Sequence, residues 1–279
     1  MRGAYAAGAL LGLYELGVSF DQVWASSSGA CSAAYYVSGC GTEGIRIWRD
    51  LVSGGQLIRL RNLLLRRPLL DLDYLIGTFR ERVPLTWDKL PPGRGGLRVV
   101  LTECKSGKPV YWKVCGREAF DVLRAATSMP FATRGYAQVD GVYFADGGIT
   151  DSIPIGAALQ AGASEVTVIL THAPGYRMRS CPRAMAHLAF PRFPRLARAL
   201  AERHVNYNAS LDLLASPPQG VTLRLIRPSR LDLHRLSRRR SRLHAAIEQG
   251  QRDAKRVFEP VRAEAGAERV GVSGSSERL

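Results

Sequence analysis

The sequence predicts a layered α/β fold with a largely parallel central sheet. Short β-branched runs alternate with helix-like segments rich in small residues along most of the chain, and strands separated by helical crossovers favour parallel pairing. A chain of 279 residues can bury a large core without metals or disulfides. A hydrophobic content of 46% and a charged content of 23% are ordinary for a globular protein. They exclude a wholly disordered chain, a collagen and a small disulfide scaffold.

Helix-like segments carry apolar residues at helical spacing and end at stops such as Gly17. They are Ala4–Leu16, Gly29–Val37, Ile45–Leu51, Ala119–Thr127 and the strongly basic Leu236–Val257. Residues 56–83 are predicted to mix helix and loop. The range Pro182–Leu214 is predicted as a helix interrupted at Pro191 and Pro194, because proline removes a helical hydrogen-bond donor.

Strand-like segments are short and are β-branched or alternate in polarity. They are Val18–Trp24, Leu97–Glu103, Lys108–Val114, Val142–Ala145, Ser164–Thr171 and Val221–Ile226. The second and third form a predicted pair around the turn Lys105–Lys108, and Pro91–Gly96 reads as a turn-rich loop. We expect one domain over residues 1–260. A disordered tail is expected over 261–279, which is rich in Gly, Ser and charge.

The charge is concentrated in the last third of the chain. Lys and Arg number 39 against 24 Asp and Glu, a net of +15. The part from about residue 177 holds 21 basic and 9 acidic residues, whereas residues 1–176 are nearly balanced. A solvated face in an arginine-rich composition is the favoured interpretation, and a surface for phosphate-bearing partners is the alternative. The basic helix Arg235–Arg256 lacks a nucleic-acid motif and aromatic interleaving, so no nucleic acid is expected as a partner.

The five cysteines argue against disulfides and metal. Their number is odd and no two are spaced as C-x-x-C, so neither a disulfide framework nor a zinc site is predicted. We expect no metal or cofactor, and a reducing compartment. The apolar stretch Ala4–Leu16 is too short to cross a bilayer, which needs about 20 residues, and no signal peptide is visible. A cytoplasmic location is expected, with at most peripheral contact with a membrane.

A candidate nucleophile lies where a predicted strand meets a predicted helix. Ser27 has Ala25 two residues before it and Gly29 two residues after it, which is the small-x-Ser-x-Gly layout of a nucleophile turn. The strained turn needs tiny flanking residues, and the following helix N-terminus favours negative charge. Runs of Ser, Ala and Gly are also ordinary helix caps, so this motif alone is weak.

Asp146 is the candidate partner. A strand delivers it into a turn containing Gly147 and Gly148. Two glycines are expected to permit left-handed backbone angles and to leave the carboxylate uncovered. The plainer interpretation is a common Asp-Gly turn. At the start of the chain, Met1-Arg2-Gly3 reads by itself as a helix N-terminus packed by small residues.

Together these segments resemble the patatin-like phospholipase family, whose motifs run in the order G-G-G-x-R-G, G-x-S-x-G and D-G-G or D-G-A. Met1-Arg2-Gly3 matches the end of the first motif. Ala25–Gly29 matches the second, with Ala25 in place of the usual glycine, and Asp146–Gly148 matches the third. The similarity extends to about Ala254, and Arg203–Asn208 and Ile226–Ser229 resemble the bacterial branch of the family.

The resemblance implies a three-layer sandwich and a serine–aspartate dyad. Ser27 would attack a lipid ester, and Asp146 would take its proton directly, giving an acyl-enzyme that water releases. An ordinary aspartate has a pKa of about 3.9, so a base at this position is expected to be partly buried. The oxyanion and motif residues would be Arg2, Gly3, Ser28, Gly29, Gly147 and Gly148. All five histidines follow Asp146, so a Ser…Asp…His order stays formally open, although none has a recognisable catalytic setting.

The resemblance also raises an expectation about the start of the chain. The family's first glycines, whose N–H groups hold the oxyanion, and the strand that carries them would precede Met1, so we expect the natural protein to begin further upstream. Two functions follow from this. The first is a serine acyl hydrolase, of phospholipase A or carboxylic esterase type, acting on phospholipid or another lipid ester. The alternative is a non-catalytic or impaired protein that binds lipid or anions on the same fold.

Overall fold

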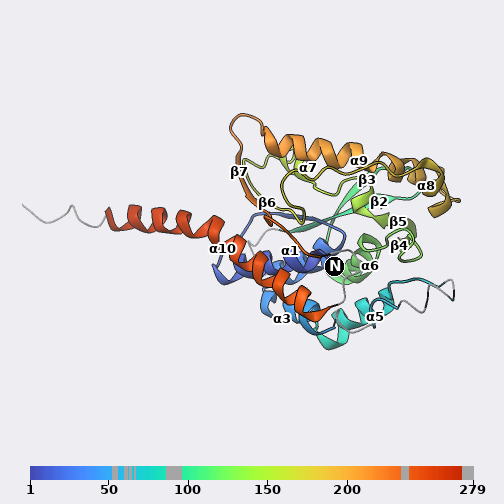
Figure 1. Ribbon diagram of the computed structural model, residues 1–279, viewed down its shortest axis with the longest axis horizontal. Helices are drawn as coiled ribbons and strands as arrows, with labels where there is room; N and C mark the ends of the chain where they lie inside the picture. The colour runs from blue at the N-terminus through green and yellow to red at the C-terminus, as the bar shows by residue number, and fades with distance from the viewer. Residues whose placement is uncertain are drawn as a thin grey trace, which may run out of the picture.

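The computed structural model describes residues 1–51, 56–59, 62, 65, 67–85, 96–233 and 239–271. Strands form a middle layer between two layers of helices (Figure 1). Helices α7, α8 and α9 lie on one side of the strands, and α1, α3, α6 and α10 lie on the other. The predicted three-layer α/β fold class is confirmed in this arrangement.

The helices of the described residues carry the labels of Figure 1. They are α1 (Gly3–Glu15), α2 (Ser28–Val37), α3 (Gly41–Arg46), α5 (Leu72–Gly77), α6 (Ala119–Ala126), α7 (Ile155–Gln160), α8 (Arg183–Ala189), α9 (Pro194–Ala215) and α10 (Arg240–Gly271). Two π-helical turns, Ile47–Leu51 and Thr78–Arg82, continue α3 and α5. Two 3₁₀ turns cover Gly116–Glu118 and Gly147–Ile149. None of the described helices combines the length and the apolar character that a bilayer crossing requires.

The strands form two sheets. They are β1 (Val23–Ser26), β2 (Leu97–Glu103), β3 (Pro109–Lys113), β4 (Ala137–Val139), β5 (Val142–Asp146), β6 (Glu165–Ile169) and β7 (Thr222–Ile226). Parallel pairing joins β1 to β2 and β6 to β7, and β3, β5 and β4 add antiparallel neighbours to the first sheet. The first sheet ends at β1 and the second at β6, and both of these strands line the same cavity.

Several predicted boundaries shift for local reasons. The strand predicted from Val18 begins only at Val23, because Gly17 has a φ of +68° and the Val18 N–H donates to the Leu13 carbonyl, which keeps residue 18 in the helix cap. The three-residue strand β4 was not predicted. Helix α10 runs through residues 261–271 of the predicted tail. Residues 272–279, the loop at 91–95 and His234 lie outside the described residues.

Helices α1 and α10 pack at backbone distance. A Cβ atom added at Gly8 would lie 2.0 Å from the Ile247 carbonyl oxygen, and one at Gly250 would lie 2.1 Å from the Tyr5 carbonyl oxygen. Side chains other than hydrogen would therefore force the two helices apart. The Tyr5 hydroxyl donates to Asp253 across the same contact at 2.8 Å, so the helix that begins at Gly3 is held in place by residues near the other end of the chain.

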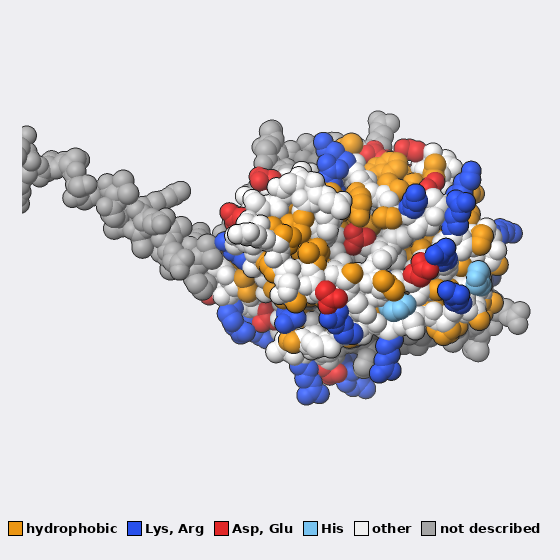
Figure 2. Space-filling model, turned by 90° about the horizontal axis from the view of Figure 1, so that it is seen from above, with side chains coloured by type: hydrophobic (Ala, Val, Ile, Leu, Met, Phe, Trp, Pro, Cys, Tyr) orange, Lys and Arg blue, Asp and Glu red, His pale blue; other side chains and the backbone are white. Residues whose placement is uncertain are grey.

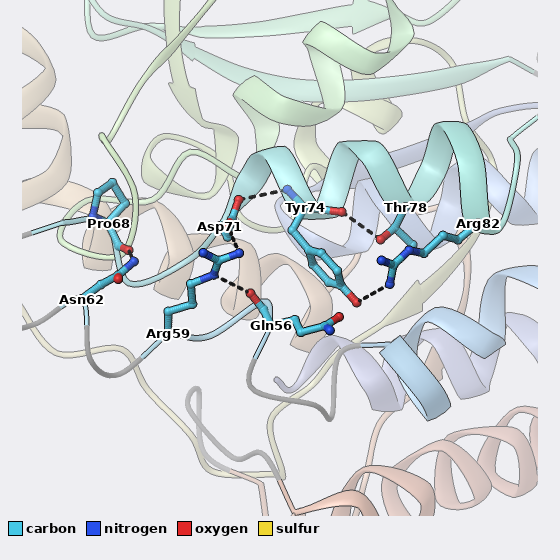
Figure 3. Close-up of polar contacts among 8 residues, drawn as sticks. All are labelled: Gln56, Arg59, Asn62, Pro68, Asp71, Tyr74, Thr78 and Arg82. Carbon is cyan, nitrogen blue, oxygen red and sulfur yellow. Dashed lines mark hydrogen bonds and ion pairs between the residues drawn. The ribbon is translucent and has the colours of Figure 1, made fainter.

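The segment around α5 is fixed by its own polar contacts (Figure 3). Asp71 caps α5 by accepting from the Tyr74 N–H at 2.9 Å, and it pairs with Arg59 at 2.8 Å. The Tyr74 hydroxyl accepts from Arg82 at 3.2 Å. Because an N-cap and an ion pair hold the start of α5, the apolar Leu72 and Leu75 are presented to the cavity that both sheets line.

Candidate active site

Ser27 occupies the turn between β1 and α2 in a strained conformation. Its φ is +53° and its ψ is −138°, angles that an ordinary side chain avoids and that cost on the order of 1–3 kcal/mol. Such a turn lifts the side chain out of the strand and sets it at the start of a helix. A Cβ at Gly29 would meet no atom within 4 Å beyond its chain neighbours and the backbone of α2. Gly29 lines the cavity, so its missing side chain leaves room for a ligand.

Asp146, at the end of β5, lies directly beside Ser27. The Ser27 Oγ donates to Asp146 Oδ2 at 2.6 Å. The other carboxylate oxygen accepts from the Gly148 N–H at 2.7 Å, and the aspartate is only 4% exposed. Its backbone carbonyl accepts from the Thr102 hydroxyl at 3.0 Å. A carboxylate held at both oxygens and at its backbone has a fixed orientation toward the serine.

Sheet register brings these two residues together across 119 positions of sequence. Ser26 lies opposite Val100 on β2, and Asp146 lies opposite the next residue, Leu101. Because β3 occupies the other edge of β2, the ends of β1 and β5 meet along one edge, and the serine and the aspartate lie next to each other where the chain turns into α2.

Gly147 and Gly148 serve a different purpose from the one expected. Neither has a positive φ, so the predicted left-handed turn is wrong; a 3₁₀ turn over Gly147–Ile149 follows Asp146 instead. A Cβ at Gly147 would lie 2.0 Å from the Val100 carbonyl oxygen. The glycine is required because the turn crosses β2 at contact distance, and this close crossing seats Asp146.

Two helix N-termini converge next to Ser27. Gly3 begins α1 and Ser28 begins α2, and a Cβ at Gly3 would lie only 2.6 Å from the Ser28 Oγ. The first N–H groups of a helix have no acceptor within the helix, and the helix dipole places partial positive charge there. This arrangement favours an anion close to the serine hydroxyl.

A cavity of about 1650 Å³ opens over the serine and the aspartate. Ser27, Asp146, Arg2, Gly3, Ser28, Gly29 and Gly148 all line it, whereas Gly147 does not and lies against β2. Much of the remaining wall is apolar and includes Leu57, Leu75 and Phe79. The volume exceeds the several hundred Å³ of a common small-molecule site, so the cavity has room for a long apolar chain.

The structure adds residues that the sequence motifs did not indicate. Arg203 of α9 donates from Nη2 to the Ser152 Oγ at 3.4 Å, and a Cβ at Gly148 would lie 3.3 Å from the same nitrogen. The Ser152 hydroxyl donates to the Gly148 carbonyl at 2.7 Å. Arg203 thus brings a cation to the turn that follows Asp146. In the sequence, Arg203 belongs to the segment Arg203–Asn208, which resembles the bacterial branch of the family. Asn206 of this segment donates to the Thr150 carbonyl at 3.0 Å and so supports the same turn.

His172 lines the cavity, but it contacts Arg2 and not the serine. The Arg2 guanidinium hydrogen-bonds the imidazole, and the ring stacks on Tyr176 with centroids 3.5 Å apart. Among the residues that the structure describes, Ser27 makes no hydrogen bond to a histidine. The geometry pairs the serine with the aspartate.

Cys31 lies in the same wall and is buried. Burial, with a smaller contribution from the charge of Asp146, raises the pKa of its thiol to about 12. The thiol is therefore protonated at neutral pH and is a poor nucleophile. Within the described ranges, no three His, Cys, Asp or Glu side chains come together as metal ligands.

Comparison with known proteins agrees with this geometry. The family model "Patatin-like phospholipase" matches residues 1–159, and "Domain of unknown function (DUF6363)" matches residues 193–264. The "Uncharacterized protein YjjU" of Escherichia coli (strain K12) is 30% identical over 106 residues, which are 37% of this chain and 30% of that relative. The chain thus aligns with less than a third of the relative's length. The first model covers more than half of the chain and includes both Ser27 and Asp146, so this protein belongs to the patatin-like phospholipase family of lipid hydrolases.

Proposed function

We propose that the protein is a serine acyl hydrolase that cleaves a phospholipid or another lipid carboxylic ester. The observation that carries the proposal is the 2.6 Å hydrogen bond from the Ser27 Oγ to Asp146 Oδ2 in a turn with strained backbone. A serine is a weak nucleophile until a neighbouring base takes its proton. Asp146 is in reach to act as that base.

In the proposed first half-reaction, Ser27 Oγ attacks the ester carbonyl carbon while its proton passes to Asp146. The carbonyl oxygen becomes an anion, which N–H groups at the starts of α1 and α2 would stabilise; Gly3, Ser28 and Gly29 would supply them. Removing one such donor typically costs about 3–4 kcal/mol in the barrier. Collapse of the intermediate expels the alcohol, which takes the proton from Asp146, and leaves the acyl group on Ser27.

In the second half-reaction, water replaces the alcohol. Asp146 takes a proton from the water, and the resulting hydroxide attacks the carbonyl carbon of the acyl-enzyme. The proton then returns to Ser27 Oγ as the fatty acid leaves. Gly147 and Gly148 would keep the carboxylate in place, since the Gly148 N–H binds Asp146 Oδ1. Arg2 would support the start of α1, where its Nε donates to the Leu233 carbonyl at 3.3 Å.

The apolar wall and the volume of the cavity support a lipid substrate. The net charge of +12 carried by residues 177–279 supports contact with an anionic membrane surface, on which such a substrate would be met. Cofactors play no part in the steps above, because the serine and the aspartate supply both the nucleophile and the proton transfers.

Covalent labelling with a fluorophosphonate probe, read by intact mass, tests the proposal. The wild-type protein should gain one probe adduct, Ser27→Ala should gain none, and Asp146→Asn should be labelled far more slowly. Ser216→Ala, which removes an exposed serine outside the cavity, is the matched control and should label like the wild type. A wild-type protein that takes up no probe while binding lipid would favour the non-catalytic alternative and refute the proposed hydrolase.

A further inference from the structure

Helix α8 presents apolar side chains to solvent. Met185 is 50% exposed and Leu188 is 76% exposed, although both are large and hydrophobic. They lie three residues apart and so share one face of the helix. Ala186, which points the other way, is completely buried. The helix is thus anchored on its inner side and offers an apolar outer side that no described part of the chain covers.

Exposed apolar side chains, one of them on α8, also border the cavity. Phe131 and Met185 both line the cavity that holds Ser27, and Phe131 is 57% exposed. Phe131 also has a φ of +62°, which is rare for a bulky side chain. A residue that is strained, aromatic and exposed at the rim of a cavity contributes little to the packing of the core. Its position suits contact with a partner or ligand that binds from outside the protein.

The segment that carries α8 is rich in positive charge. Residues 166–201 contain six arginines and no Asp or Glu. Arg183, Arg192 and Arg195 are exposed, and none of them forms a salt bridge to another described residue. Viewed from the side of α9, the surface carries Lys and Arg side chains interspersed with hydrophobic ones (Figure 2). The local field therefore favours an anionic partner.

We propose that Phe131, Met185 and Leu188, flanked by Arg183, Arg192 and Arg195, form a docking face for the surface of an anionic phospholipid bilayer. The three apolar side chains would enter the headgroup layer, and the three arginines would bind lipid phosphates. This inference rests on the proposed function, because it names the surface across which a lipid would pass into the cavity over Ser27.

A bilayer fits this face better than a folded protein partner does. The core of a protein interface is depleted in charge and needs a complementary shape. Here a few separate apolar side chains stand among cations of one sign, and a fluid layer of anionic headgroups can satisfy both without a matching contour. Phe131 and Met185 line the cavity that also holds Ser27, so a lipid that enters between them would reach the space over the serine.

Vesicle flotation tests the docking face without turnover when every variant carries Ser27→Ala. The test variant replaces Arg183, Arg192 and Arg195 with serine, and vesicles contain phosphatidylcholine with or without phosphatidylglycerol. A basic residue near such a surface contributes about 1 kcal/mol, or about fivefold in affinity. Binding to the anionic vesicles should therefore weaken by about 100-fold.

The matched control removes the same charge elsewhere. Arg46→Ser, Arg227→Ser and Arg230→Ser change exposed arginines on α3 and after β7, on other sides of the molecule from α8 (Figure 1). This triple variant should lose less than about fivefold in affinity. Equal losses in the two triple variants would overturn the proposal, because net charge and not a defined face would then carry the binding.

The apolar part is tested by Met185→Ser combined with Leu188→Ser, with Leu65→Ser as the control for an exposed leucine elsewhere. The double variant should bind anionic vesicles about tenfold more weakly, and Leu65→Ser should bind like the parent. Circular dichroism and the melting temperature confirm that each variant is folded. If the double variant binds normally, α8 is not inserted. Since binding is measured without catalysis, failure to hydrolyse lipid would refute the proposed function and leave this result unaffected.

Discussion

Substituting glycine in α1 gives a sharp test of how the two ends of the chain pack. In an isolated or exposed helix, Gly→Ala stabilises by up to about 1 kcal/mol, because alanine has the higher helix propensity. At Gly8, however, the new Cβ would lie 2.0 Å from the Ile247 carbonyl oxygen, far inside any normal contact. The carbonyl belongs to the backbone of α10 and cannot turn aside as a flexible side chain would.

The expected magnitude follows from these opposing effects. Overpacking a well-packed contact costs up to about 3 kcal/mol, and the propensity gain of about 1 kcal/mol offsets part of this cost. Gly8→Ala should therefore destabilise the protein by about 2 kcal/mol. For a chain of this size that corresponds to a loss of about 4 °C in the melting temperature.

Gly156→Ala is the matched control. Gly156 lies within α7, and a Cβ there would meet no atom within 4 Å. The same substitution should raise the free energy of unfolding by about 0.5–1 kcal/mol. Urea unfolding and thermal melting, followed by circular dichroism, measure both variants. The reasoning is refuted if Gly8→Ala leaves stability unchanged or increases it, since α1 and α10 would then not meet at backbone distance.

Three further predictions concern the site. Asp146→Asn should lower ester hydrolysis by a hundredfold to ten-thousandfold, about the usual contribution of a general base, while circular dichroism stays as in the wild type. Gly147→Ala should abolish hydrolysis and lower the melting temperature, because the new Cβ would lie 2.0 Å from the Val100 carbonyl oxygen and displace Asp146; a variant with wild-type activity and stability would contradict that close crossing. The raised pKa of Cys31, about 12 in the folded protein, means that the unfolded chain loses this proton first as pH rises above about 9. This thiol alone should therefore lower the free energy of unfolding by on the order of 1 kcal/mol per pH unit between about pH 9 and pH 12, and Cys31→Ala should show a shallower decline in alkaline urea titrations.

The elements with strong local patterns were predictable from the sequence. Leu97–Glu103 is an apolar, β-branched run that pairs with its neighbour as expected, and the helix at the N-terminus ends just before the predicted glycine. Strand β4 was not predictable, since three residues carry no measurable periodicity and Ala137–Val139 is a strand only through its pairing with β5. The start of β1 was misjudged for a related reason, because a hydrogen bond from the Val18 N–H back to the Leu13 carbonyl keeps residue 18 in the cap of α1.

The candidate site divides in the same way. The motifs around Ser27 and Asp146 indicated the residues that meet at 2.6 Å. The role of Gly147 was not visible, because its need for space comes from Val100, which is distant in sequence. The segment Arg203–Asn208 was noted in the sequence, but the role of Arg203 was not, because its closeness to Gly148 depends on how α9 crosses the turn after β5 and no local spacing encodes that crossing.

The terminal strands of the two sheets expose main-chain hydrogen-bonding groups to the cavity. Strand β1 ends one sheet and β6 ends the other, and every residue of both strands lines the cavity. The outer side of a terminal strand offers peptide N–H and C=O groups for pairing. A polypeptide strand added to either edge would gain main-chain hydrogen bonds, as in strand addition. A strand bound in this way would occupy the cavity that we propose for the lipid, so lipid and polypeptide would compete for the same space.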